Sequence, residues 1–238
     1  MNFKFRPLLI PTIFTIPALI VLLGLGSWQV QRLNQKEALI AKIEEKSSLP
    51  AVNMPGNITD LEKWQYRKIK LSGRFIHDKE VHLYTGPKVM HGRPGYNIFT
   101  PLLLKNGSFV WVDRGWVPSE VKEASARPST LVKGDVDIIG MLHSSETPGS
   151  FTPENMVDKN MWFWIDIPSM SKNSSIKTPD YYVRLIRKTG DTTFPVGGDV
   201  EIRHRNDHLQ YAITWYSLAI ILLVIYVLYH RKVQNIKS

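Results

Sequence analysis

The sequence predicts a membrane protein in which two transmembrane α-helices form a hairpin that carries an inserted, mainly antiparallel β domain. Three observations predict this class. Two segments of more than 20 residues lack Asp, Glu, Lys and Arg, and short basic tails flank them. The 176 residues at 32–207 contain alternating apolar and polar stretches with turn signals. The chain of 238 residues is therefore expected to be an α+β protein with one extramembrane domain.

The first charge-free segment covers residues 7–31, a length of 25 residues. About 20 apolar residues cross the hydrocarbon core of a bilayer, and membrane helices tolerate the prolines that this segment contains. A cleaved signal peptide is the alternative, because Lys4 and Arg6 precede an apolar run with small residues near its end. The length of the run, together with Trp28 and Arg32 at its end, favours an uncleaved helix anchored at the interface.

The second charge-free segment covers residues 209–229, and the tails determine the expected orientation. Short basic tails stay in the cytoplasm, whereas a long loop crosses the membrane largely regardless of its charge. Only six residues precede the first segment, which leaves no room for a mitochondrial transit peptide and favours a bacterial inner membrane. The expected organisation is a cytoplasmic tail at 1–6, a transmembrane helix at 7–31, a periplasmic β domain at 32–207, a second transmembrane helix at 208–229 and a cytoplasmic tail at 230–238.

The loop is expected to fold as a small antiparallel barrel or a sandwich. Residues 35–48 have helical spacing and should continue the first helix beyond the membrane. Asn106-Gly107 lies between two apolar runs and predicts a hairpin in which both turn positions have positive φ. Connections are expected around 118–128 and 168–179. Strands are predicted at 69–75, 81–84, 96–104, 109–113, 135–142, 161–166 and 181–187.

Composition excludes several functions. The chain has no cysteine, so disulfides, thiolate metal sites and thiol catalysis are excluded. The net charge of +9 suggests nucleic acid, but five of the 30 basic residues lie in the tails, and the loop has 25 basic against 21 acidic residues. Because no concentrated basic face remains, no nucleic-acid partner is expected. No phosphate loop, nucleophile elbow or metalloprotease motif occurs, so the chain is not expected to be an enzyme.

The candidate site lies where polar and aromatic residues meet the outer ends of the two helices. Trp28 and Arg32 end the first helix, and His208, Tyr211 and Trp215 share one face at the start of the second. In a first helical turn the dipole disfavours imidazolium, which keeps His208 neutral, as a metal ligand must be. A structural histidine within an interfacial aromatic belt is the alternative that these residues leave open.

Three segments resemble the Surfeit locus protein 1 family. They are LGSWQVQRL at residues 25–33, VDRGWVP at 112–118 and RNDHLQYAITWY at 205–216, and GY at 95–96 with TP at 100–101 fits the pattern between them. The resemblance covers nearly the whole chain, in order and with the two-helix layout. Asp113 departs from the family's loop signature, where an asparagine is expected.

The resemblance implies an assembly factor for haem–copper cytochrome c oxidase that acts while haem a enters the catalytic subunit, with His208 as the axial ligand of the haem iron. Haem a is then expected between Trp28 and the His208 face, with Tyr211 and Trp215 lining the pocket and Arg32 or Arg205 paired with the haem propionates. The expected partners are the oxidase catalytic subunit, the haem a synthesis machinery and membrane lipid, and a homo-oligomer is left open. A haem-free scaffold that stabilises an oxidase assembly intermediate is the alternative.

Overall fold

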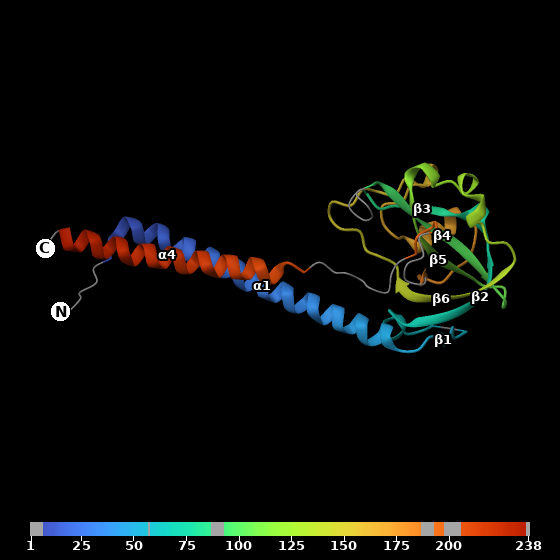
Figure 1. Ribbon diagram of the computed structural model, residues 1–238, viewed down its shortest axis with the longest axis horizontal. Helices are drawn as coiled ribbons and strands as arrows, with labels where there is room; N and C mark the ends of the chain where they lie inside the picture. Colours follow the sequence, from blue (N-terminus) through green and yellow to red (C-terminus); the bar gives the residue numbers. More distant parts are fainter. Residues whose placement is uncertain (1–6, 57, 87–92, 187–192, 198–205, 237–238) are drawn as a thin grey trace. The chain divides into compact units, whose positions relative to one another are not determined.

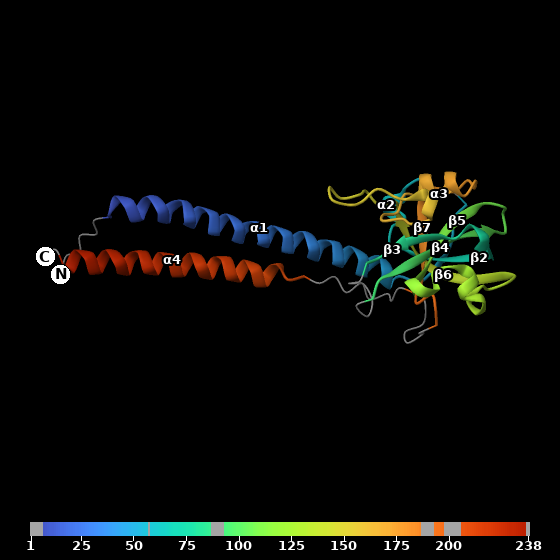
Figure 2. The same ribbon diagram turned by 90° about the horizontal axis from the view of Figure 1, so that it is seen from above.

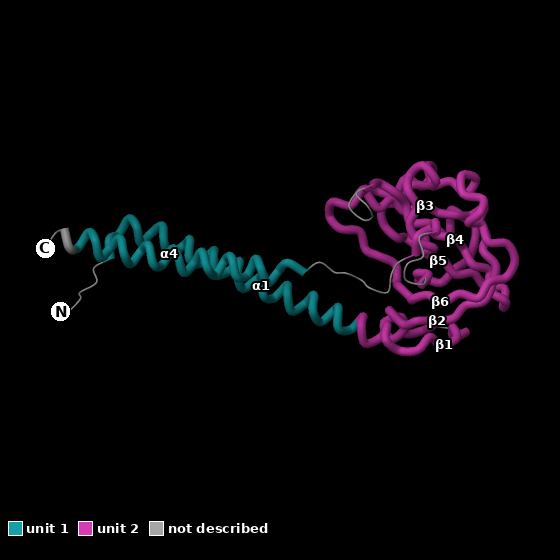
Figure 3. Tube along the Cα trace, viewed as in Figure 1, with its two compact units in different colours: residues 1–42, 203–238 teal, residues 43–202 magenta. Residues whose placement is uncertain are grey.

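The computed structural model describes residues 7–56, 58–86, 93–186, 193–197 and 206–236. The chain divides into two compact units, which have different colours in Figure 3. Residues 1–42 and 203–238 make up the first unit, which contains the apolar helices. Residues 43–202 make up the second unit, which contains the β domain.

The first unit is built from two long helices, α1 (Leu9–Ser48, whose last turns belong to the second unit) and α4 (His208–Ile236). The two run side by side in both views (Figures 1 and 2). They are antiparallel, because Leu8 contacts His230 at one end and Gln29 contacts His208 at the other. Each helix is long and apolar enough to span a bilayer, so the predicted hairpin of membrane helices is confirmed.

The helix α1 continues without interruption through the segment 35–48, as predicted. Pro17 lies inside it, which a membrane helix tolerates because neighbouring groups can satisfy the carbonyl that the missing N–H leaves free. The side of α1 that packs on α4 recurs every three to four residues and includes Gly26 and Gln29. The facing residues of α4 include Ala212 and Ala219, which are almost fully buried. Small residues at these positions let the two backbones approach closely.

The second unit is a mostly β domain with seven strands and several short helices (Figure 1). The strands are β1 (Val52–Asn53), β2 (Lys68–Phe75), β3 (Val81–Tyr84), β4 (Gly95–Leu104), β5 (Phe109–Pro118), β6 (Asp135–Ser144) and β7 (Tyr181–Leu185). The short helices are α2 (Leu61–Trp64) and α3 (Ile167–Asn173), with single 3₁₀ turns at η1 (His77–Lys79), η2 (Ser119–Val121), η3 (Ala124–Ala126), η4 (Pro128–Thr130) and η5 (Val157–Lys159).

Five of these strands close into a barrel. The strand order is β1-β2-β6-β7-β5-β4-β3, and β2 also pairs with β4, which joins the two ends of the run β2-β6-β7-β5-β4. All neighbouring pairs in this barrel are antiparallel except β5 and β7, which are parallel. A small barrel was one of the two expected architectures, and closure removes the free edges that a sandwich would keep.

The β4–β5 hairpin forms as predicted, but its turn differs from the expectation. Gly107 has a φ of +83°, whereas Asn106 is not among the residues with positive φ. The N–H of Leu104 donates to the carbonyl of Ser108 at 2.8 Å, so three residues form the loop rather than two. A three-residue hairpin needs a left-handed residue only at its last position, which glycine supplies.

The strand predicted at 161–166 is wrong, and β1 was not predicted. Trp162 makes only a single bridge, to Leu83, and Asp166 instead caps α3 by accepting a hydrogen bond from the N–H of Ser169 at 3.1 Å. Trp162 is fully buried in a cluster on the outside of the barrel, where α3 covers the sheet. The aromatic run therefore packs as a covering segment and not as a strand.

Candidate functional site

The candidate site in the helix pair centres on a hydrogen bond between His208 and Gln29. His208 is the first residue of α4, and its Nδ1 lies 2.7 Å from Oε1 of Gln29 on α1. Gln29 is only 8% exposed, whereas His208 is half-buried. Among the described residues, His208 Nε2 has no hydrogen-bond partner. The imidazole therefore has one nitrogen engaged within the helix pair and one nitrogen open.

Close helix packing lies one turn away from this hydrogen bond. A Cβ added to Gly26 would lie 2.7 Å from the ring of Tyr216, so only glycine allows this approach. The hydroxyl of Ser27 lies 3.2 Å from the hydroxyl of Tyr216. The sequence segment Gly26-Ser27-Trp28-Gln29 thus supplies the contacts that bring α1 and α4 together near His208.

The other residues of the predicted site lie in different environments. The guanidinium of Arg32 lies 5.7 Å from the centre of the Trp28 ring, and Trp28 is 47% exposed. Trp215 is half-buried on the side of α4 that packs on α1, but Tyr211 is 54% exposed. Arg205 lies outside the described residues. The helix pair thus brings His208 and Trp215 to one side, and it does not bring Tyr211 there.

Gln29 was not among the predicted site residues, although it lies between two that were. Trp28 and Arg32, which the sequence predicts to be interfacial anchors, both lie at exposed positions of α1. Residues three positions apart lie on the same face of a helix, so Gln29 shares a face with Gly26, and this spacing is a signal in the sequence that could have identified it. Within the described part of the chain, no three His, Asp or Glu residues gather into a metal site, so His208 is a single imidazole and not part of a cluster.

A second polar contact lies at the other end of the helix pair. The backbone N–H of Leu8 donates to Nε2 of His230 at 3.0 Å, and Nδ1 of His230 lies 2.7 Å from the carbonyl of Tyr226. The hydroxyls of Thr12 and Tyr226 are 2.6 Å apart. His230 is fully buried, and both of its ring nitrogens are engaged, so it acts as a link between the helices. It differs in this from His208, whose Nε2 is open.

In the β domain, Glu80 is the centre of a buried ion cluster. Its carboxylate pairs with Arg114 at 3.1 Å and with Arg127, and it also contacts His77 and Thr100. Burial favours the neutral acid, but the hydrogen bonds from His77 and Arg127 and the charges of both arginines outweigh it and lower the pKa of Glu80 to about 2. Arg114 belongs to the motif VDRGWVP, whose arginine therefore has a structural partner.

A second ion pair lies on the outer face of the barrel. Asp113 is 1% exposed, accepts hydrogen bonds from Asn97 and from the N–H of Gly115, and pairs with Arg184 at 3.0 Å. Burial opposes the charge on Arg184, but the charge of Asp113 and the hydrogen bond to it raise the pKa of Arg184 above its ordinary value. The buried aspartate also orients Gly115, which has a φ of +115°. Both clusters are internally satisfied and hold strands in place.

His143 lies near the second ion pair. Its ring stacks on Tyr182 at a centroid distance of 5.3 Å, and its buried Nε2 has no hydrogen-bond partner in the part of the chain that the structure describes. Burial and the charge of Arg184 lower the pKa of His143 to about 3. A histidine in this environment stays neutral at physiological pH.

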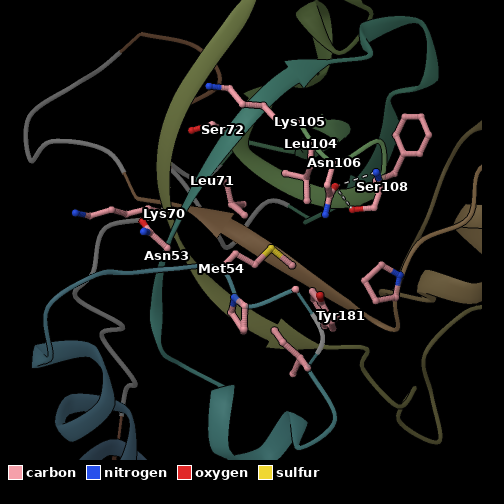
Figure 4. A pocket seen from close by; sticks show the side chains of 15 residues that line it. Asn53, Met54, Lys70, Leu71, Ser72, Leu104, Lys105, Asn106, Ser108 and Tyr181 are labelled. Atoms are coloured by element: carbon pink, nitrogen blue, oxygen red, sulfur yellow. Dashed lines mark hydrogen bonds between the residues drawn. The ribbon is translucent and has the colours of Figure 1, made fainter.

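The β domain also has a pocket of about 570 Å³, shown in Figure 4. It opens where the β4–β5 hairpin turns and where β1 pairs with β2, and Met54, Leu71 and Tyr181 form part of its apolar lining. Its charged lining residues are Lys70 and Lys105, both exposed, and neither forms an ion pair with a described residue. Its lining residues include no histidine, so the pocket offers no imidazole ligand.

Comparison with known proteins gives the family. The SURF1 family model matches residues 16–220. The chain is 36% identical over 231 residues to a SURF1-like protein of Monosiga brevicollis, covering 91% of this chain and 86% of the relative. It is 32% identical over 219 residues to a SURF1-like protein of Rickettsia felis, covering 91% and 95%. It is also 32% identical over 212 residues to Surfeit locus protein 1 of Homo sapiens, covering 82% and 69%. This protein, a β barrel between two membrane helices, therefore belongs to the SURF1 family.

Proposed function

We propose that this protein is an assembly factor for haem–copper cytochrome c oxidase that binds haem a during its insertion into the catalytic subunit. The observation that carries the proposal is the environment of His208. It is an imidazole on an apolar helix pair, engaged at Nδ1 and open at Nε2. Membership of the family supports the assembly role, and the open nitrogen supports the haem role.

The residues around His208 fit a haem group. An axial ligand must be a neutral imidazole with a free nitrogen, and metal-bound histidines typically use their other nitrogen in a hydrogen bond. Trp215, on the same side of α4, can pack against an apolar macrocycle, and Arg32 carries a charge that suits a propionate. Bound there, haem would supply an iron centre that takes Nε2 as a ligand. The proposed role is carriage and not catalysis, so no enzymatic step is assigned.

The proposed location is a bacterial inner membrane with both termini in the cytoplasm and the β domain in the periplasm. The basic residues of both tails support this orientation. The proposed partners are the oxidase catalytic subunit and the machinery that makes haem a, with lipid around the helices.

The chain's lack of cysteine gives a direct test of the orientation, since any introduced cysteine is then the sole thiol. In intact cells, an impermeant maleimide should label Ser150→Cys, and it should label Ser238→Cys only after the cells are permeabilised. Labelling of Ser238→Cys in intact cells would contradict the orientation.

The haem role is tested by absorbance. Full-length protein purified from cells that make haem a should carry a haem spectrum, and His208→Ala should lose it. The sequence has a second histidine four residues earlier, and His204→Ala, as the control, should keep the spectrum. Colourless wild-type protein would contradict the haem role and favour the haem-free scaffold. If His204→Ala lost haem and His208→Ala retained it, the ligand would be His204, and the assignment of His208 would be contradicted.

A further inference from the structure

The hydrogen bond between Gln29 and His208 determines which ring nitrogen carries the proton. A neutral imidazole has one N–H and one lone pair, and an amide oxygen can only accept a hydrogen bond. Because Oε1 of Gln29 faces Nδ1 at 2.7 Å, the proton belongs on Nδ1 and the lone pair on Nε2. We propose that Gln29 is a positioning residue that fixes His208 in this tautomer, so that Nε2 is presented as the ligand atom. The presentation of Nε2 to haem iron rests on the proposed function, whereas the tautomer does not.

The surroundings of Gln29 make this a strong constraint. The side chain is 8% exposed and lies on the side of α1 that packs against α4. The close contact of Gly26 with Tyr216 holds the two helices together one turn away. A hydrogen bond that is shielded from water competes with no solvent partner and is stronger than an exposed one. The ring of His208 is thus held in one tautomer and in one orientation.

The chemistry of the acceptor also matters. Hydrogen bonds to the second nitrogen of a metal-bound histidine raise its basicity, and their loss typically costs about 10- to 100-fold in metal affinity. An amide does this without adding a charge to an apolar site, whereas a carboxylate would add one. Gln29 therefore orients the imidazole without placing a charge beside it.

The first measurement needs no haem. Nitrogen-15 NMR of full-length protein labelled at histidine, with His208 assigned by its absence in His208→Ala, should show the proton of His208 on Nδ1. The variant Gln29→Leu should lose the preference for the tautomer with the proton on Nδ1. The variant Gln29→Glu has an acceptor oxygen at the same position and should keep a proton on Nδ1. Gln31→Leu is the matched control, because Gln31 is exposed on the same helix.

The second measurement uses haem a added to the same proteins. Gln29→Leu should bind about 10- to 100-fold more weakly than wild type, while Gln29→Glu and Gln31→Leu should bind within a few-fold of it. A proton on Nε2 in the wild type, or an unchanged tautomer in Gln29→Leu, would overturn the positioning role. Equal haem affinity of wild type and Gln29→Leu would overturn the inference that Gln29 strengthens haem binding through His208. Should the wild type bind no haem while its proton lies on Nδ1, the haem role fails and the tautomer assignment stands.

Discussion

Replacing Glu80 by glutamine is expected to destabilise the β domain by about 3 to 5 kcal/mol, the usual cost of removing one partner of a buried ion pair. The carboxylate is 3% exposed, and the side chains of Arg114 and Arg127 are 2% and 3% exposed. In the variant, both guanidiniums would stay buried and would lose the negative charge of Glu80. A pKa of about 2, against 4.5 for the free side chain, gives a contribution of about 3 kcal/mol near neutral pH, which agrees with that range.

The assay is urea unfolding of the full-length protein in lipid nanodiscs at pH 7, followed by tryptophan fluorescence. The buried residues Trp111, Trp116 and Trp162 make this signal report on the β domain. Glu123→Gln is the matched control, because its ion pair with Lys122 is exposed and should contribute less than about 1 kcal/mol.

The pH dependence gives a second check on Glu80. Its pKa is lower in the folded protein than in the unfolded chain, so its contribution is complete above about pH 4.5 and is lost as the pH falls toward 2. The stability difference between wild type and Glu80→Gln should therefore shrink only below pH 4.5. A difference no larger than that of Glu123→Gln at pH 7 would refute the reasoning.

Three further substitutions test other contacts. Gly26→Val should weaken haem retention several-fold, because the added side chain forces the ring of Tyr216 away. Gly24→Val is the control and should not weaken it, since nothing lies within 4 Å of its added Cβ. Haem absorbance per amount of protein measures retention in the two variants. Asp113→Asn should cost about 1.5 to 3 kcal/mol through its weakened hydrogen bonds to Arg184 and the backbone, and an unchanged urea midpoint would contradict this. Because the pKa of His143 is lowered to about 3, the unfolded chain binds its proton first, and this residue should lower the stability by about 1.4 kcal/mol per pH unit as the pH falls from 6.5 to 3. In pH-dependent unfolding, His143→Phe should remove this contribution between pH 6.5 and 4.5, where Glu80 does not yet titrate.

Several elements could be predicted because their signals are local. A bilayer imposes a minimum apolar length on contiguous residues, so both membrane helices could be read from the chain. The β4–β5 hairpin also depends on adjacent residues, and Asn106-Gly107 marked it correctly even though the turn has three loop residues and not two. The aromatic run at 161–166 had the composition of a strand. Its apolar side chains are instead buried against the outside of the barrel, although its backbone forms no strand. The composition of a segment indicates that it is buried and does not say how its backbone pairs.

The sequence by itself determined the two membrane helices, the mostly β domain between them and the family, because each depends on patterns within short segments or along the whole chain. It also placed His208 at the start of a helix. Only the tertiary structure decided that β2 pairs with β4 to close the barrel, that Glu80 lies between Arg114 and Arg127, and that Gln29 meets His208 across 179 positions of sequence. In each of these contacts, the sequence around one residue does not identify its partner. Their partners are selected by the packing of whole elements, which no local pattern encodes.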